Sequence, residues 1–83
     1  MYSKKDTVYY DDAWENFGNA IVLLAVKDYR TALSSLRRSP SNYTANMTKQ
    51  EVERFFRSGL FSAITTIDPE RLIAQLNKEV ATK

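Results

Sequence analysis

The sequence predicts an all-α fold: a three-helix domain whose long N-terminal helix, over about 12–38, packs against helices over about 49–65 and 69–81. Apolar residues recur with the helical period in each of these segments. Helix-start signals stand where the periodic segments begin, and no segment alternates apolar and polar residues as a half-buried strand does. A chain of 83 residues is expected to form one domain, in which residues 1–10 make a loosely ordered N-terminal arm.

The first helix is predicted to begin at Asp11 or Asp12, since Asp12 and Glu15 have the spacing of a capping box. It should end at Arg38, because the residue before Pro40 is biased away from helical backbone. At about 100° per residue, one face of this helix collects the residues that we expect in the core. They are Trp14, Gly18, Ile21, Val22, Ala25, Tyr29, Ala32, Leu33 and Leu36.

A second group of apolar residues lies off that face. Phe17, Leu23 and Leu24 make the helix apolar nearly all round between residues 17 and 26, and such a helix is usually covered on more than one side. Either the later helices cover these residues within the monomer, or they form an oligomer interface. A chain this short buries only about 60–65% of its unfolded surface. That thin core favours the interface, so a homo-oligomer is expected.

The second helix is predicted over about 49–65, because Thr48 and Glu51 have the spacing of a capping box. Gly59 lies inside this segment, yet the apolar stripe continues beyond it. We therefore expect the helix to pass through Gly59, bent there at most. The core stripe of this helix then includes Phe55, Phe56 and Leu60.

The backbone at Gly59 decides where Phe61 lies. In a continuous helix, Phe61 stands with Arg54 and Arg57 on one outer face, and arginine beside aromatic residues is typical of interface hot spots. The same group could stack on an anionic ring such as a nucleotide and neutralise it. If the chain breaks at Gly59 instead, Phe61 turns into the core and the arginines are solvated. Arg54, Arg57 and Phe61 are thus candidate partner-binding residues under the continuous-helix interpretation.

The third helix is predicted over about 69–81. Asp68 is a favourable N-cap residue, Pro69 suits the first helical position, and Glu70 places an acid in the first turn. Its single apolar face is formed by Leu72, Ile73, Leu76 and Val80.

The composition argues against an enzyme. The sequence has no His and no Cys, which removes the usual general base, the thiol nucleophile and the commonest zinc ligands. The acidic group of Asp11, Asp12 and Glu15 is better explained by the helix dipole than by a bound cation. We therefore expect no catalytic residue, cofactor or metal.

Positive charge gathers toward the end of the first helix. Residues 27–38 sum to +3, whereas residues 1–16 sum to −2. The basic face is either solvated near a helix C-terminus or a contact surface for phosphates or an acidic partner. The overall charge of +2 is too mild to favour nucleic acid, which is the second choice of partner. The candidate partner-binding cations are Lys27, Arg30, Arg37 and Arg38.

Three stretches carry a resemblance to known proteins: Ala25-Val26-Lys27-Asp28-Tyr29-Arg30 with Ala32-Leu33, Glu53-Arg54-Phe55-Phe56-Arg57-Ser58 with Phe61, and Ile67-Asp68 with Leu72-Ile73. Over about residues 13–80 the chain resembles short uncharacterised helical proteins of phages and mobile elements in Gram-positive bacteria. Those proteins often have an aromatic residue in place of Leu60, and Gly-Glu in place of Pro69-Glu70. The resemblance implies a stoichiometric inhibitor of host machinery, such as an anti-CRISPR protein, or a regulatory factor.

These expectations describe a small non-enzymatic protein that acts by stoichiometric binding to a host or defence-system protein. The alternatives are nucleic-acid binding through the basic face of the first helix and an oligomeric sponge for an anionic nucleotide signal. The longest apolar run, residues 20–26, is far shorter than the about 20 residues that span a bilayer. Lys4 and Lys5 lead into polar residues, unlike a secretory signal. A cytoplasmic location without membrane association is therefore expected.

Overall fold

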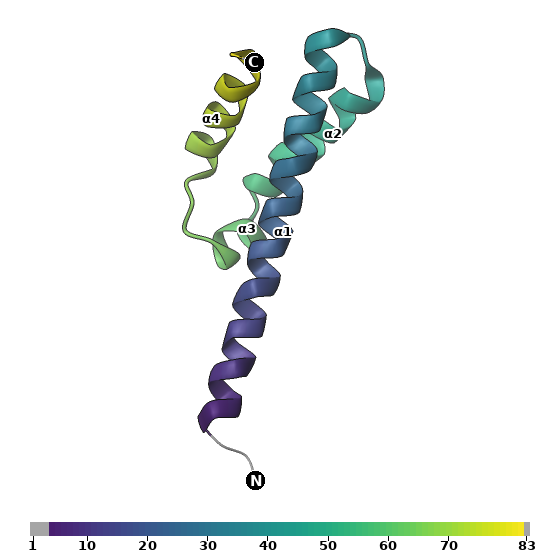
Figure 1. Ribbon diagram of the computed structural model, residues 1–83. Helices are drawn as coiled ribbons and strands as arrows, with labels where there is room; N and C mark the ends of the chain where they lie inside the picture. The colour runs from purple at the N-terminus through teal and green to yellow at the C-terminus, as the bar shows by residue number, and fades with distance from the viewer. Residues whose placement is uncertain (1–3, 83) are drawn as a thin grey trace.

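A computed structural model describes the backbone of residues 4–82 and the side chains of residues 16–82. This part of the chain is all-α and contains no strand, so the predicted fold class is confirmed. Figure 1 shows one long helix, with the shorter helices packed against its C-terminal part. The helices are α1 (Lys4–Arg38), α2 (Tyr43–Phe56), α3 (Gly59–Ile64) and α4 (Pro69–Ala81).

α1 begins well before the expected start near residue 12. No Gly or Pro stands between Lys4 and Asp12 to stop a helix, and the expected arm of residues 1–10 is helical from Lys4 onward. Residues 1–3 lie outside the described part of the chain. The N-terminal part of α1 extends past α3 and away from the other helices, which makes the molecule 58 Å long and at most 24 Å wide (Figure 1).

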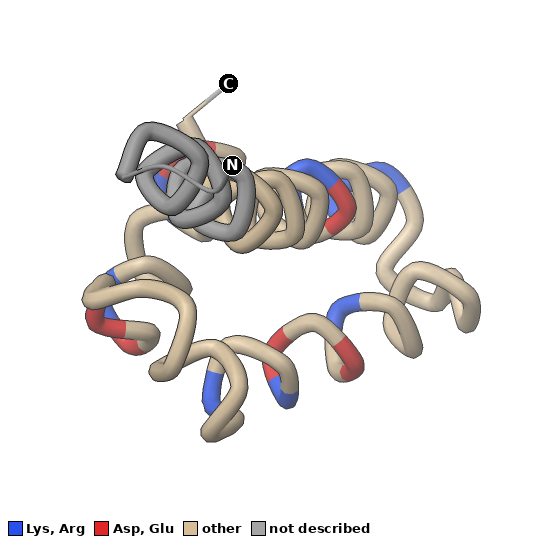
Figure 2. The backbone as a smooth tube through the Cα atoms, turned by 90° about the horizontal axis from the view of Figure 1, so that it is seen from below, with Lys and Arg blue, Asp and Glu red and all other residues tan. Residues whose placement is uncertain are grey.

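α2 also begins earlier than expected, because a different residue caps it. Asn42 is the N-cap, and its Oδ1 accepts a hydrogen bond of 3.0 Å from the backbone N–H of Ala45. The expected capping pair, Thr48 and Glu51, therefore lies inside the helix. Viewed from below, α2 lies in a second layer beside α1 and carries interspersed acidic and basic residues (Figure 2).

The continuous helix over 49–65 is wrong, and the alternative of a broken helix is right. α2 ends at Phe56, and a new helix begins after Ser58. The Ser58 hydroxyl donates a hydrogen bond of 2.6 Å to the carbonyl of Phe55 and accepts one of 3.3 Å from the backbone N–H of Phe61. Because a serine side chain closes one helix and caps the next, the break needs no left-handed glycine, and no described glycine has a positive φ.

The break changes which side chains face inward. Phe61 is only 1% exposed, and its ring meets those of Phe55 and Phe56 edge-on, with centroids 5.6 and 5.4 Å away. Leu60 is 59% exposed, so its expected place in the core stripe is wrong. Because Ser58 starts a new helix, the rotation of α3 about its axis is independent of α2, and Phe61 rather than Leu60 faces the core. The buried core comprises Val22, Val26, Tyr29, Leu33, Phe56, Phe61, Ile73, Leu76 and Val80.

α4 follows the sequence expectation closely. Asp68 is its N-cap, with Oδ1 accepting a hydrogen bond of 3.0 Å from the backbone N–H of Glu70, and Pro69 occupies the first helical position. Its apolar face packs against α1, where Ile73, Leu76 and Val80 are buried.

Truncation of each side chain can test whether Phe61 rather than Leu60 is buried. We expect Phe61→Ala to lower the free energy of unfolding by about 3–5 kcal/mol, because it leaves a cavity within the aromatic cluster. Leu60→Ala should change it by no more than about 0.5 kcal/mol, since this side chain is largely solvated. Urea denaturation followed by circular dichroism measures both. Two small and equal effects would instead indicate that Phe61 faces solvent.

Candidate interaction surface

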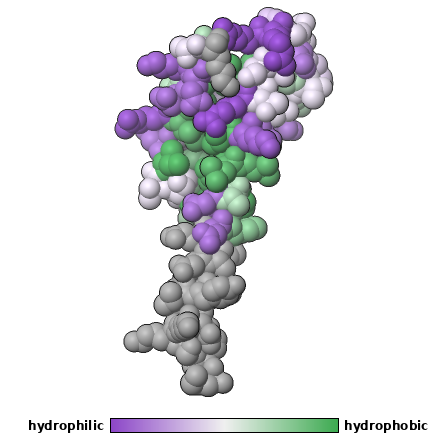
Figure 3. All heavy atoms as spheres, in the orientation of Figure 1, coloured by the Kyte–Doolittle hydropathy of each residue, from purple (hydrophilic) through white to green (hydrophobic). Residues whose placement is uncertain are grey.

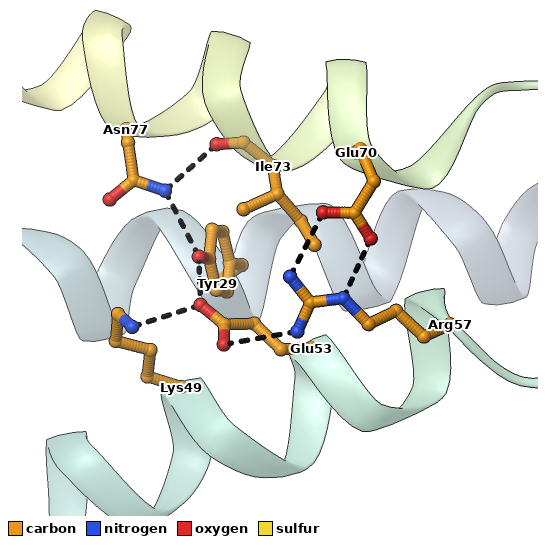
Figure 4. A network of polar contacts seen from close by, with 7 residues as sticks. All are labelled: Tyr29, Lys49, Glu53, Arg57, Glu70, Ile73 and Asn77. Carbon is orange, nitrogen blue, oxygen red and sulfur yellow. Dashed lines mark hydrogen bonds and ion pairs between the residues drawn. The ribbon is translucent and has the colours of Figure 1, made fainter.

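A buried tyrosine links three helices through its hydroxyl (Figure 4). The Tyr29 side chain of α1 is fully buried. Its hydroxyl donates a hydrogen bond of 2.6 Å to Oε2 of Glu53 on α2 and accepts one of 3.1 Å from Nδ2 of Asn77 on α4. The same Asn77 amide donates a bond of 2.8 Å to the carbonyl of Ile73. No described buried side-chain N or O lacks a hydrogen-bond partner, so this network holds the helices together without a desolvation penalty left uncompensated.

Ion pairs extend the network to the surface. Lys49 Nζ lies 2.9 Å from Glu53 Oε2, and Arg57 Nη1 lies 3.7 Å from Glu53 Oε1. Arg57 also donates two hydrogen bonds, of 2.7 and 3.0 Å, to the two oxygens of Glu70 in the first turn of α4. The Arg57 side chain thus fastens the end of α2 to the start of α4 across α3 (Figure 4).

These contacts shift the pKa values of the groups involved. Burial, and then the hydrogen bond to Glu53, raise the pKa of Tyr29 to about 12. Burial opposes ionisation of Glu53, but hydrogen bonds from Tyr29 and Lys49 outweigh it and lower the pKa of that carboxyl. The bond from Arg57 likewise lowers the pKa of Glu70 and raises that of Arg57 itself. Glu53 and Glu70 are therefore held as carboxylates, as the network requires.

Two of the four cations on the basic face of the first helix bond to α4, and the other two are exposed. Arg30 donates hydrogen bonds of 2.8 and 3.2 Å to the carboxylate of Glu79, and Arg37 Nη1 donates one of 2.6 Å to the carbonyl of Val80. Both arginines thereby hold α4, and Arg37 places positive charge at the C-terminal end of that helix. Lys27 and Arg38 are exposed. The four candidate cations do not form one free contact surface, which weakens the case for a phosphate backbone as ligand.

The predicted outer grouping of Arg54, Arg57 and Phe61 does not exist. It required a continuous helix, whereas the break at Ser58 buries Phe61 and Arg57 pairs with Glu70. Arg54 is exposed and borders an open hollow of about 540 Å³ that Glu53 also lines. Arg57 lines the same hollow, but its guanidinium is paired with the carboxylates of Glu53 and Glu70, which reduces the positive charge that it offers an anionic nucleotide there.

Large apolar side chains are also exposed on several helices, Tyr43 and Met47 of α2 among them. Phe17, Leu23 and Leu24 of α1 are 57%, 67% and 60% exposed, so the monomer leaves more than half of each of these residues in contact with solvent. Leu60 of α3 and Ile67 before α4 add to this apolar surface. Figure 3 shows apolar side chains gathered across the middle of the molecule at the level of α3, below a hydrophilic upper part. Sequence analysis missed Leu60, because its orientation follows from the break at Ser58.

Other kinds of site find little support among the described residues. They contain no group of three His, Cys, Asp or Glu that could hold a metal ion. The side chains of Asp11, Asp12 and Glu15 lie outside this description. No helix in the described part of the chain combines the length and apolar character needed to cross a bilayer. Comparison with protein-family models, with curated proteins and with solved structures found no match to this chain.

The Tyr29 hydroxyl makes the stability depend on alkaline pH. The folded chain keeps this proton up to a pKa of about 12, whereas the unfolded chain releases it near 10. Raising the pH through this window therefore favours unfolding, and wild type should lose about 2–3 kcal/mol. Tyr29→Phe should be about 1–3 kcal/mol less stable at neutral pH, because Glu53 and Asn77 lose a buried partner.

Urea titrations of both proteins at neutral pH and within the alkaline window measure these differences. The variant should show a shallower alkaline loss, because it lacks the Tyr29 hydroxyl whose pKa is raised in the folded chain. Parallel losses in the two proteins would contradict the assignment to Tyr29.

Proposed function

We propose that this protein acts by non-covalent binding to another protein through its exposed apolar surface, without catalysis. The observation that carries the proposal is the exposure of several large apolar side chains, Leu23 and Leu60 among them, on an 83-residue chain. Soluble monomers rarely expose large contiguous apolar patches, and those that do commonly use them as interaction sites.

The way the charged side chains are used supports a binding role for the apolar surface. Arg30, Arg37 and Arg57 all bond to groups of the protein itself. The cations left for steering a partner, such as Lys27 and Arg54, do not form a basic stripe of the kind that binds nucleic acid. Apolar burial is therefore the largest driving force that this molecule offers a partner, at about 25 cal/mol per Å² of apolar surface removed from water.

A biological setting follows from the resemblance to short proteins of phages and mobile elements. Such proteins need no catalytic groups to inhibit a host or defence-system protein, since a stoichiometric complex is enough. The absence of His and Cys from the sequence suits that mode of action. The proposed role is thus an anti-defence or regulatory factor that acts by forming a complex.

A site-specific photo-crosslinker can test the proposal. It is introduced at Leu23 or Leu60 in one set of proteins and at Gln75, an exposed polar position on α4, in the control. We expect one protein of the native host to crosslink from the apolar positions and not from Gln75. That protein, once purified, should bind wild type and lose at least about tenfold in affinity to Leu23→Asp. Equal labelling from Gln75, or unchanged binding of Leu23→Asp, would reject this surface.

A further inference from the structure

α1 carries a second apolar stripe besides its core face. Phe17, Ala20, Ile21 and Leu24 are spaced i, i+3, i+4 and i+7, which places them on one side of the helix. This side stripe lies roughly 130° around the helix from the face of Val22 and the rest of the core. Phe17, Ala20 and Leu24 are exposed and Ile21 is partly buried. Leu23 is also exposed but lies about 100° away from the stripe.

The side stripe sits at the middle of α1. The helix runs from Lys4 to Arg38, so its midpoint is near Ile21. The midpoint of the stripe falls between Ala20 and Ile21. A two-fold axis at this point pairs two antiparallel α1 helices over their whole length, which no other centre of pairing does. We propose that this chain forms a homodimer in which the two α1 helices pack antiparallel along the side stripe.

The stripe is self-complementary in this arrangement. Phe17 of one copy packs against Leu24 of the other, and each such contact occurs twice because the interface is isologous. Ala20 lies at the centre, where a small side chain lets two helix axes approach closely. The dimer rests on the proposed function only in that both use exposed apolar surface. It leaves Leu23, Leu60 and Ile67 for a different protein.

Charge favours the antiparallel direction over the parallel one. Residues 1–16 have a net charge of −2, from four acidic residues and two lysines. At the other end of α1, Glu79 neutralises Arg30, which leaves three cations against Asp28 within residues 27–38. Antiparallel pairing brings these oppositely charged halves together, whereas parallel pairing brings like charges together.

A groove lies beside the stripe where the second helix would pass. It has a volume of about 410 Å³ and separates α1 from the start of α2. Asp28, Thr31 and Ser35 line it from α1, on the same side of that helix as the stripe. In the antiparallel dimer the N-terminal half of the other α1 runs along this groove. The part of α1 that extends past α3 in Figure 1 thereby gains a neighbour.

The length of α1 makes the interface large enough. Four residues alone bury too little area, because a stable interface takes about 800 Å² from each partner. Two helices of 35 residues that overlap completely run side by side for about 50 Å. The exposed stripe supplies the apolar centre of this contact, and the hydroxyl-lined groove supplies a polar rim.

Sedimentation equilibrium of the full chain over a wide range of concentration tests the dimer with matched variants. Wild type should be a dimer, and Leu24→Asp should weaken dimerisation by at least about tenfold. Leu23→Asp makes the same chemical change at the neighbouring exposed position and should leave the dimer intact. Circular dichroism checks that both variants stay folded. A monomeric wild type, or equal effects of the two variants, would overturn the proposal.

Disulfide formation tests the direction of pairing, since the natural sequence has no Cys. Ala20→Cys lies beside the two-fold axis and should form a covalent dimer under mild oxidation. Thr31→Cys should not, because antiparallel pairing separates the two copies of residue 31 by roughly 30 Å. A covalent dimer from Thr31→Cys would indicate parallel pairing, and no covalent dimer from Ala20→Cys would reject the stripe as the interface.

These results are separable from those for the proposed function. A wild-type monomer that still binds its partner through Leu23 rejects the dimer alone. A stable dimer that crosslinks to no other protein rejects the proposed partner binding and leaves the dimer standing.

Discussion

The hydroxyl of one buried tyrosine sets the arrangement of this protein. Tyr29 contributes a large apolar ring to the core, and burying its hydroxyl without partners would be unfavourable. Glu53 of α2 and Asn77 of α4 supply the two bonds it needs. Because these partners come from different helices, satisfying one hydroxyl fixes both α2 and α4 against α1. The ion pairs from Lys49 and Arg57 keep Glu53 ionised and are built around that requirement.

The same arrangement explains why the positions of the basic residues do not identify the interaction surface. Three arginines bond to groups of the protein itself. Arg57 connects the end of α2 to α4, and Arg30 and Arg37 bind α4 to α1. With these cations engaged internally, several large apolar side chains stay exposed, among them Leu23 and Leu24 at the middle of α1. The exposure of apolar side chains of α1 outside its core face is the basis of the proposed binding role.

Local signals in the sequence were sufficient where a residue acts on its immediate neighbours. Asp68 with Pro69 predicted the start of α4, since a cap and a proline act on the backbone a few residues ahead. The helical period predicted the all-α class and the exposed group around Leu24. The same local reasoning failed at α2, because it assigned the helix start to Thr48, whereas the side chain of Asn42 caps the helix.

The sequence by itself thus determined that the chain is helical, where its last helix begins and which residues of α1 exceed the needs of one core. Only the tertiary structure decided the break at Ser58. A continuous helix and a broken one differ little in local propensity, whereas burying the ring of Phe61 against Phe55 and Phe56 is possible only after the break. Burial of a phenylalanine contributes roughly 2–3 kcal/mol to the free energy of folding. The break costs less than this in hydrogen bonds, because the bonds of the Ser58 side chain replace some of those that a continuous turn would make.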